Sequence, residues 1–150
     1  MHCLGIDYGE KRIGLAWGDE LGVATPMPAA VQPDAAARMD HIAGIVRTRR
    51  VDQIVVGYPY NMDGSVGFKA KEVDAFIALL EARLGLPVHR VDERLTSHKV
   101  ESDMGLSARR ERELRRKGVV DSGAAAVILQ DWLDMNLPAP ELLHDDSEED

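Results

Sequence analysis

The sequence has little of three features that would point to other classes of protein. Its only cysteine is Cys3, so no disulfide can form within the chain, which fits a reducing cytoplasm. It has no run of about 18 apolar residues, so no membrane-spanning helix is expected. The first residues lack a basic segment followed by an apolar one, which argues against a signal peptide. We therefore expect a cytoplasmic protein with one compact domain and Cys3 as a buried structural thiol.

The net charge of −8 is unevenly distributed along the chain. Six acidic residues and no Lys or Arg lie within the last ten positions. The rest of the chain carries basic clusters at Arg47–Arg50 and Arg109–Lys117, and local clusters set the field that a phosphate group experiences. The sequence therefore predicts a folded domain over residues 1–138 and an acidic, disordered tail over residues 139–150. Overall acidity does not exclude a nucleic-acid partner.

Apolar patterns predict an α/β fold. Short apolar runs predict strands at Cys3–Asp7, Ile13–Trp17, Gln53–Gly57 and Pro87–Val91, with Val23–Val31 as an edge strand because it contains prolines. Helical spacing predicts helices from Asp34 to Val46, from Val73 to Leu84, from Thr96 to Met104 and from Asp121 to Leu133. An opening antiparallel hairpin followed by alternating helices and strands predicts a mixed sheet with helices on its faces.

Three carboxylates occupy the ends of predicted elements. Asp7 ends the first strand, Glu93 follows the last strand and Asp121 opens the last helix. Each has an ordinary alternative, since Asp7 could form a turn, Glu93 could be a solvated strand end and Asp121 could cap its helix. If the three meet beyond the strand ends, their mutual repulsion requires a cation. Carboxylate oxygens suit Mg²⁺ or Mn²⁺, and such ions promote the hydrolysis of phosphodiesters.

Four segments resemble the signatures of one known family. They are GIDYGEKRIGLA at Gly5–Ala16, GYPYNMDGS at Gly57–Ser65, DERLTS at Asp92–Ser97 and VVDSGAAAVILQ at Val119–Gln130. In this order they resemble the YqgF family, also called RuvX, over about residues 4–134. That family is a branch of the RNase H-like superfamily and is similar to the RuvC Holliday junction resolvases.

The resemblance implies a RuvC-like mixed five-stranded sheet and a nuclease activity. It maps the family's catalytic and metal-binding acids onto Asp7, Glu93 and Asp121. It implies Mg²⁺ or Mn²⁺ as the cofactor and processing of the 5′ end of pre-16S ribosomal RNA as the function. RuvC resolvases carry a further acid one helical turn after the last-helix Asp, where this chain has Ala124. The number of metal ions therefore stays open.

Basic and polar residues near the three acids are candidates for binding substrate. The candidates are Lys11, Arg12, Asn61, Arg94, Thr96, Ser97, Arg109, Arg110, Arg115 and Arg116. Lys11 and Arg12 could instead lie in a solvated turn, and Asn61 could form a turn beside Asp63. The hydroxyls of Thr96 and Ser97 could cap a helix. The basic run Arg109–Lys117 either grips a nucleic-acid backbone or forms a solvated loop.

Three functions remain open from the sequence. The first is a metal-dependent nuclease acting on ribosomal RNA precursor, and the second is the same core cutting branched DNA. The third is a non-catalytic nucleic-acid-binding assembly factor, against which the retention of three acids argues. A homodimer would suit a two-fold symmetric junction, but the sequence does not give the oligomeric state.

Overall fold

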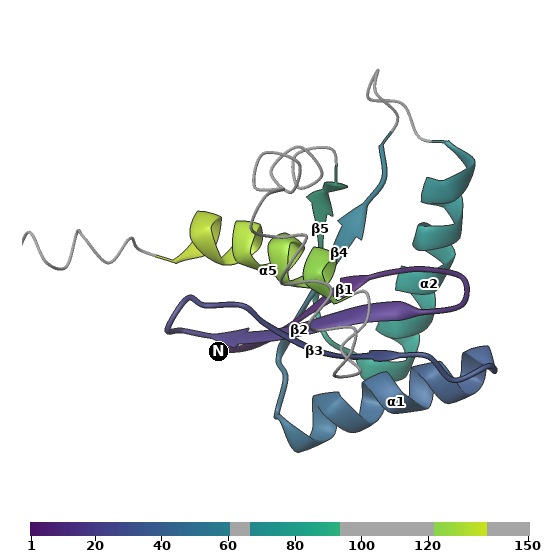
Figure 1. Cartoon of the computed structure of the whole chain (residues 1–150), viewed down its shortest axis with the longest axis horizontal. Helices are drawn as coiled ribbons and strands as arrows, with labels where there is room; N and C mark the ends of the chain where they lie inside the picture. Colours follow the sequence, from purple (N-terminus) through teal and green to yellow (C-terminus); the bar gives the residue numbers. More distant parts are fainter. Residues whose placement is uncertain (61–66, 94–121, 138–150) are drawn as a thin grey trace, which may run out of the picture.

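A single mixed sheet forms the centre of the molecule (Figure 1). The computed structural model describes residues 1–60, 67–93 and 122–137. The elements in chain order are β1 (His2–Asp7), β2 (Ile13–Asp19), β3 (Thr25–Ala30), α1 (Ala35–Thr48), β4 (Gln53–Tyr58), α2 (Phe68–Leu84), β5 (Val88–Asp92) and α5 (Gly123–Asn136). The strands lie in the order β3-β2-β1-β4-β5. The five-stranded α/β fold expected from the sequence is confirmed.

Strand pairing follows the prediction as well. β1 pairs antiparallel with β2 and parallel with β4, and β4 pairs parallel with β5. β3 is an edge strand that contains Pro26 and Pro28, as expected for residues that cannot donate to a sheet ladder. The C-terminal ends of β1, β4 and β5 therefore lie at the same edge of the sheet.

Local signals set most helix ends, and the last helix differs from its prediction. Asp34 caps α1 by accepting a hydrogen bond from the Ala37 backbone N–H at 3.1 Å. Gly85 ends α2 in the left-handed conformation with a φ of 65°. α5 begins at Gly123, with Ser122 in the N-cap position, so the predicted start at Asp121 was too early. Ala124 in the first turn of α5 is exposed.

Bulky side chains fill one face of the sheet. Strand residues of alternating position point to this face, where they pack against α1 and α2. The bulky buried members from the sheet are Leu4, Ile6, Ile13, Leu15, Ile54, Val56 and Tyr58. Branched side chains of this size bury much apolar area, so this face contributes most to stability.

Small side chains line the opposite face, which α5 covers (Figure 1). A Cβ atom on Gly5 would lie 2.6 Å from the Leu129 Cβ atom and 3.0 Å from the Ala125 carbonyl oxygen. A Cβ atom on Gly18 would lie 2.9 Å from Leu133 Cδ1. Glycine at these positions allows α5 to approach the sheet closely. Cys3 is fully buried on this face, as predicted.

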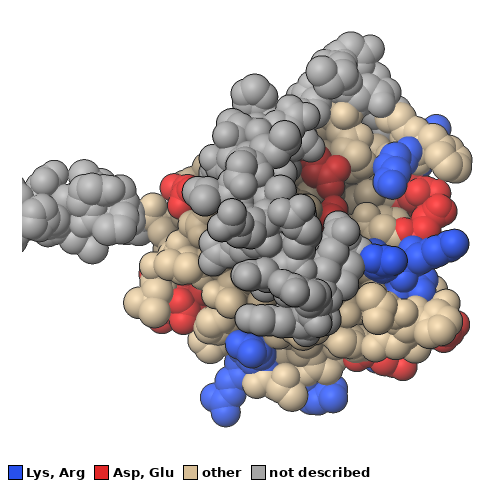
Figure 2. Space-filling model, viewed as in Figure 1, with Lys and Arg blue, Asp and Glu red and all other residues tan. Residues whose placement is uncertain are grey.

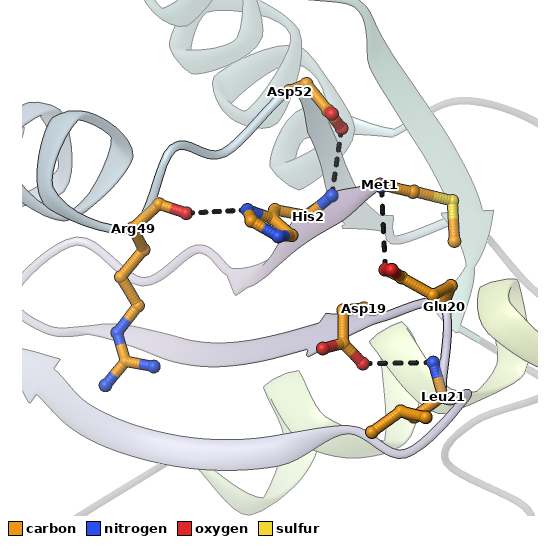
Figure 3. Close-up of polar contacts among 7 residues, drawn as sticks. All are labelled: Met1, His2, Asp19, Glu20, Leu21, Arg49 and Asp52. Atoms are coloured by element: carbon orange, nitrogen blue, oxygen red, sulfur yellow. Dashed lines mark hydrogen bonds and ion pairs between the residues drawn. The ribbon is translucent and has the colours of Figure 1, made fainter.

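Polar contacts close the sheet edge at which β1 begins (Figure 3). The His2 backbone N–H donates to Asp52 Oδ1 at 3.1 Å, and the His2 ring Nδ1 lies 3.0 Å from the Arg49 carbonyl oxygen. The N-terminal ammonium of Met1 lies 3.6 Å from Glu20 Oε1. These contacts connect the start of β1 to the residue after β2 and to the loop between α1 and β4, at the end of the sheet opposite Asp7.

In the described part of the chain, no helix has both the length and the apolar character to cross a membrane.

Candidate active site

Asp7 and Glu93 lie on the same face of the sheet, the one that α5 covers. Side chains alternate between faces along a strand, so Asp7 shares the face of Cys3. Glu93 follows the end of β5, and its carboxylate lies with Ile128 of α5 above Gly57 on this same face. Asp92 falls on the opposite face, because it directly follows Val91 in β5. Two of the three predicted acids are thus directed toward α5 from strands separated only by β4.

Gly57 lies between these two acids. The register pairs Ile6 with Val56, so Asp7 lies beside Gly57 on the neighbouring strand. A Cβ atom on Gly57 would lie 2.9 Å from Glu93 Oε1 and 2.5 Å from Ile128 Cδ1. The Glu93 carboxylate therefore occupies the space above Gly57, one strand spacing of about 4.8 Å from the strand that carries Asp7. Glycine leaves room for both the carboxylate and the helix.

An open cleft of about 360 Å³ connects Asp7 with the start of α5. Its lining comes from the turn after β1, the beginning of β2 and the first turn of α5: Asp7, Tyr8, Gly9, Lys11, Arg12, Gly14, Gly123 and Ala124. Figure 2 shows acidic atoms near the centre of this view, with Lys and Arg side chains to their right. Lys11 and Arg12 thus share a cleft with Asp7, whereas Glu93 is not part of its lining.

Ser122 fixes the start of α5 against the sheet. Its hydroxyl donates to the Met27 carbonyl of β3 and accepts from the Leu15 backbone N–H of β2 at 3.2 Å. The β2–β3 pairing is irregular between Ile13 and Leu15, so the hydroxyl bridges two backbone groups there. Ser122 is fully buried. The helix start is therefore held at the cleft by a residue that the sequence analysis did not identify.

Arg38 supports the turn that carries Lys11 and Arg12. This guanidinium is buried, and it donates to the carbonyl of Glu10 at 2.9 Å and to the carbonyl of Gln32. Gly9 is required in the same turn, since a Cβ atom there would lie 2.5 Å from the Arg12 carbonyl oxygen. Arg38 thereby ties α1 to the basic side of the cleft, and only the fold reveals this role.

Tyr58 has a structural role on the other face. Its hydroxyl donates to Asp74 Oδ2 of α2 at 2.9 Å, and the Arg90 guanidinium lies over its ring. Burial and this carboxylate raise the pKa of Tyr58. Its ring also contacts Tyr60, with centroids 4.7 Å apart. These contacts attach α2 to the sheet, so Tyr58 lies on the face opposite the two acids.

Several predicted site residues lie outside the described residues. They are Asn61, Asp63, Arg94, Thr96, Ser97, Arg109, Arg110, Arg115, Arg116 and Asp121. Their roles stay predictions. The helix over Thr96–Met104 and the disordered tail over residues 139–150 also stay predictions. Among the residues that are described, no group of three or more His, Cys, Asp or Glu side chains could hold a metal ion. The described site contains Asp7 and Glu93 as candidate ligands, and Asp121 directly precedes Ser122 in the sequence.

Comparisons with known proteins connect this site to one family. The sequence model of the RuvX family, described as Holliday junction resolvase, matches residues 1–135. A relative from Opitutus terrae named "Putative pre-16S rRNA nuclease" is 54% identical over 141 residues, which are 93% of this chain and 96% of the relative. A relative of the same name from Syntrophus aciditrophicus is 44% identical over 89% of each chain.

Solved structures show the same fold. Thermus thermophilus RuvC in complex with a Holliday junction substrate matches with a TM-score of 0.55 at 14% identity, covering 91% of this chain and 97% of that chain. A second Thermus thermophilus RuvC structure matches with a TM-score of 0.52 at 13% identity, covering 90% of this chain and 95% of that chain. At this identity the likeness concerns the fold, and it confirms the RuvC-like architecture predicted from the sequence motifs.

Proposed function

We propose, from the premise that this chain belongs to the RuvX family, that it is a metal-dependent nuclease with Asp7, Glu93 and Asp121 as its catalytic acids. One observation supports this proposal above the others. The Glu93 carboxylate lies over Gly57, beside the strand that ends in Asp7, and both acids face the helix that follows Asp121 in the sequence. Acids from three distant parts of the chain would then act at one edge of the sheet.

The donor set fits a hard divalent cation. Carboxylates directed to one region repel one another unless a cation lies among them, and Mg²⁺ and Mn²⁺ prefer oxygen ligands. Asp7, Glu93 and Asp121 would hold the ion. When bound, it would polarise a phosphodiester and activate water for attack. The exposed Ala124 at the cleft contributes no carboxylate, so these three acids are the complete acidic set that we assign.

Basic residues of the cleft would bind the substrate backbone. Lys11 and Arg12 line the same cleft as Asp7, so they can contact phosphates on either side of the reacting one. Arg38 holds the turn that carries Lys11 and Arg12 through a hydrogen bond to the Glu10 carbonyl. The two side chains therefore lose less conformational entropy when they bind the substrate. We assign them to positioning of the strand and the acids to the chemistry.

Ribosomal RNA precursor is the substrate that we propose. Relatives that cover nearly the whole chain carry the name of a pre-16S rRNA nuclease, and processing of this RNA would take place in the cytoplasm. The family description favours a second candidate, cleavage of four-way DNA junctions. A junction has two-fold symmetry, so that activity would require a dimer with two matched sites.

Cleavage assays with matched variants test this proposal. Labelled pre-16S RNA fragments and a four-way DNA junction are incubated with Mn²⁺ and with excess EDTA. Asp7→Asn and Glu93→Gln keep the shape of the side chains and remove charge, so cleavage should fall by about 1,000-fold or more while the circular dichroism spectrum is retained. Asp92→Asn is the matched control, because that acid precedes Glu93 and lies on the other face of the sheet. It should cleave normally.

The products distinguish the candidates. Cleavage of RNA alone supports the precursor substrate, and cleavage of the junction alone supports the second candidate. A folded Asp7→Asn protein that cuts at the normal rate would show that the assignment of this acid is wrong. Binding of both nucleic acids without cleavage by the wild-type protein would favour a non-catalytic assembly factor.

A further inference from the structure

Phe68 is an exposed aromatic residue at the start of α2. It is the first residue of that helix, and 78% of it is accessible to solvent. Lys69 and Lys71 next to it are also exposed, and neither forms an ion pair with another described residue. A single exposed apolar residue is ordinary on a protein surface. An exposed ring beside two lysines is a combination that suits a nucleic-acid strand.

Helix α2 directs this group beyond the same sheet edge as the two acids. The ring of Phe76 on α2 lies 4.6 Å from that of Tyr8, the neighbour of Asp7, and Asp74 accepts a hydrogen bond from Tyr58 at the end of β4. Phe68 precedes Phe76 by eight residues, which is about 12 Å of helix at about 1.5 Å per residue. The start of α2 therefore lies about 12 Å along the helix axis from the contact between Phe76 and Tyr8, a length of about three or four stacked bases at about 3.4 Å per base.

Stability does not account for the two lysines. The first turn of α2 contains no acidic residue, and Lys69 and Lys71 lie within its first four residues. Positive charge at this end opposes the helix dipole, which favours acidic residues there. The same helix carries Arg83 in its last turn, where a positive charge is favourable. A local pattern that weakens the fold is typical of a functional surface.

We propose that Phe68 stacks on an unpaired base of the substrate strand while Lys69 and Lys71 contact its phosphates. This inference rests on the proposed nuclease function and specifies its substrate, an RNA strand that is single-stranded several nucleotides from the cut. A base inside a duplex has both faces covered, so Phe68 selects for the unpaired state. The lysines add affinity for any strand, and the ring adds the preference.

Binding assays in EDTA test this inference without cleavage. The probe is an RNA of about 12 nucleotides, used single-stranded and as a duplex with its complement. Phe68→Ala should weaken single-strand binding by about 5-fold or more, since base–aromatic stacking contributes about 1–3 kcal/mol per base. Duplex binding should change by less than about 2-fold. Phe68→Trp should retain affinity, whereas Phe68→Leu, which keeps an apolar side chain without an aromatic face, should behave like Phe68→Ala.

Leu79→Ala is the control on the same helix, since that residue is 60% exposed and lies eleven residues further along. It should bind both probes normally. A scan of the single strand with 2-aminopurine should find a position whose fluorescence the wild-type protein quenches and Phe68→Ala does not.

The outcomes separate this inference from the proposed function. Unchanged single-strand binding by Phe68→Ala overturns it, even if Asp7→Asn abolishes cleavage. An equal loss on single strand and duplex overturns it too, because stacking on an unpaired base predicts a difference. Selective loss of single-strand binding supports it, even if the wild-type protein cuts neither nucleic acid.

Discussion

The two faces of the sheet differ in the size of their side chains, and the difference separates stability from chemistry. Toward α1 and α2 the strands present branched residues such as Leu4, Ile6 and Val56, all fully buried. Toward α5 they present Gly5, Gly57 and the two acids. The bulky face can hold the sheet together by burial alone. The other face loses apolar area at its glycines and in return brings a helix start close to two carboxylates.

Among the packing residues of this second face, the largest predicted effect comes from Gly57→Ala, and it is on cleavage. The new Cβ atom would overlap Ile128 Cδ1 and the Glu93 carboxylate, both of which are ends of flexible side chains. The protein should therefore fold, with a loss of about 1–2 kcal/mol from overpacking. Glu93 must move, and a displacement of about 1 Å at a catalytic group can reduce the rate about 100-fold. We expect a loss of that size in kcat/KM on the cleaved substrate.

The double variant Gly57→Ala with Ile128→Val separates the two effects. Removal of Cδ1 relieves the clash with the helix, so the midpoint of urea unfolding should recover. Cleavage should stay low because the Glu93 clash remains. Recovery of both would mean that helix packing, rather than the position of Glu93, had limited the activity.

The next effect is on stability, from Gly5→Ala. Its Cβ atom would meet Leu129 Cβ and the Ala125 carbonyl oxygen, which move only with the helix itself. We expect a loss of about 3 kcal/mol in the free energy of unfolding, measured in urea. Gly44→Ala on α1 is the matched control, since nothing lies within 4 Å of its Cβ atom. It should be neutral or stabilise by up to about 1 kcal/mol. Equal effects of the two substitutions would contradict the close packing of α5.

Ser122→Ala should have a smaller effect on stability. It leaves the Leu15 N–H and the Met27 carbonyl without the hydroxyl that bridges them. A buried group that loses its partner costs about 1–3 kcal/mol, and a water molecule in the vacated space would reduce that cost. We expect about 2 kcal/mol in urea unfolding, with faster amide exchange at Leu15. Unchanged exchange there would show that the bridge is dispensable.

The smallest effect concerns Cys3 on the α5 face. Burial raises the pKa of this thiol to about 11, from an ordinary value near 9. The folded state thus keeps a proton that the unfolded state loses first. Stability is unaffected below pH 9 and should fall as the pH rises from about 9 to about 11. Cys3→Ala should reduce this fall, and native Cys3 should resist iodoacetamide at pH 8. Rapid alkylation of the folded protein would contradict its burial.

Much of the fold could be predicted because its signals are local. Asp34 and Gly85 act within one turn of the helix ends that they set, and the prolines of β3 exclude it from the centre of the sheet. The start of α5 was harder to predict from the sequence. Asp121 and Ser122 are both common N-cap residues, so the sequence could not distinguish them, whereas the position of Ser122 is set by partners on β2 and β3.

Only part of the site could be predicted from the sequence. Strand ends and the two-residue period could place Asp7 and Glu93 on one face once their strands were neighbours. The role of Gly57 was missed, although small residues alternate with bulky ones in β1 and Gly57 lies between two bulky residues of β4, which is a readable signal. Arg38 and Ser122 could not be found, because the groups they bind lie as far as 28 and 107 positions away. Asp121 stays a prediction.

The position of α5 in the chain affects when the protein can become active during synthesis. A ribosome makes β1 through β5 first, and domains begin to fold from the N-terminal side as they emerge. Until α5 is released, the nascent sheet has its bulky face covered while its glycine-lined face awaits a helix. The basic turn and the Glu93 strand would exist, but the helix start that closes the cleft would not. Until α5 has folded onto the sheet, the chain thus carries an incomplete cleft, because Gly123 and Ala124 supply part of its lining.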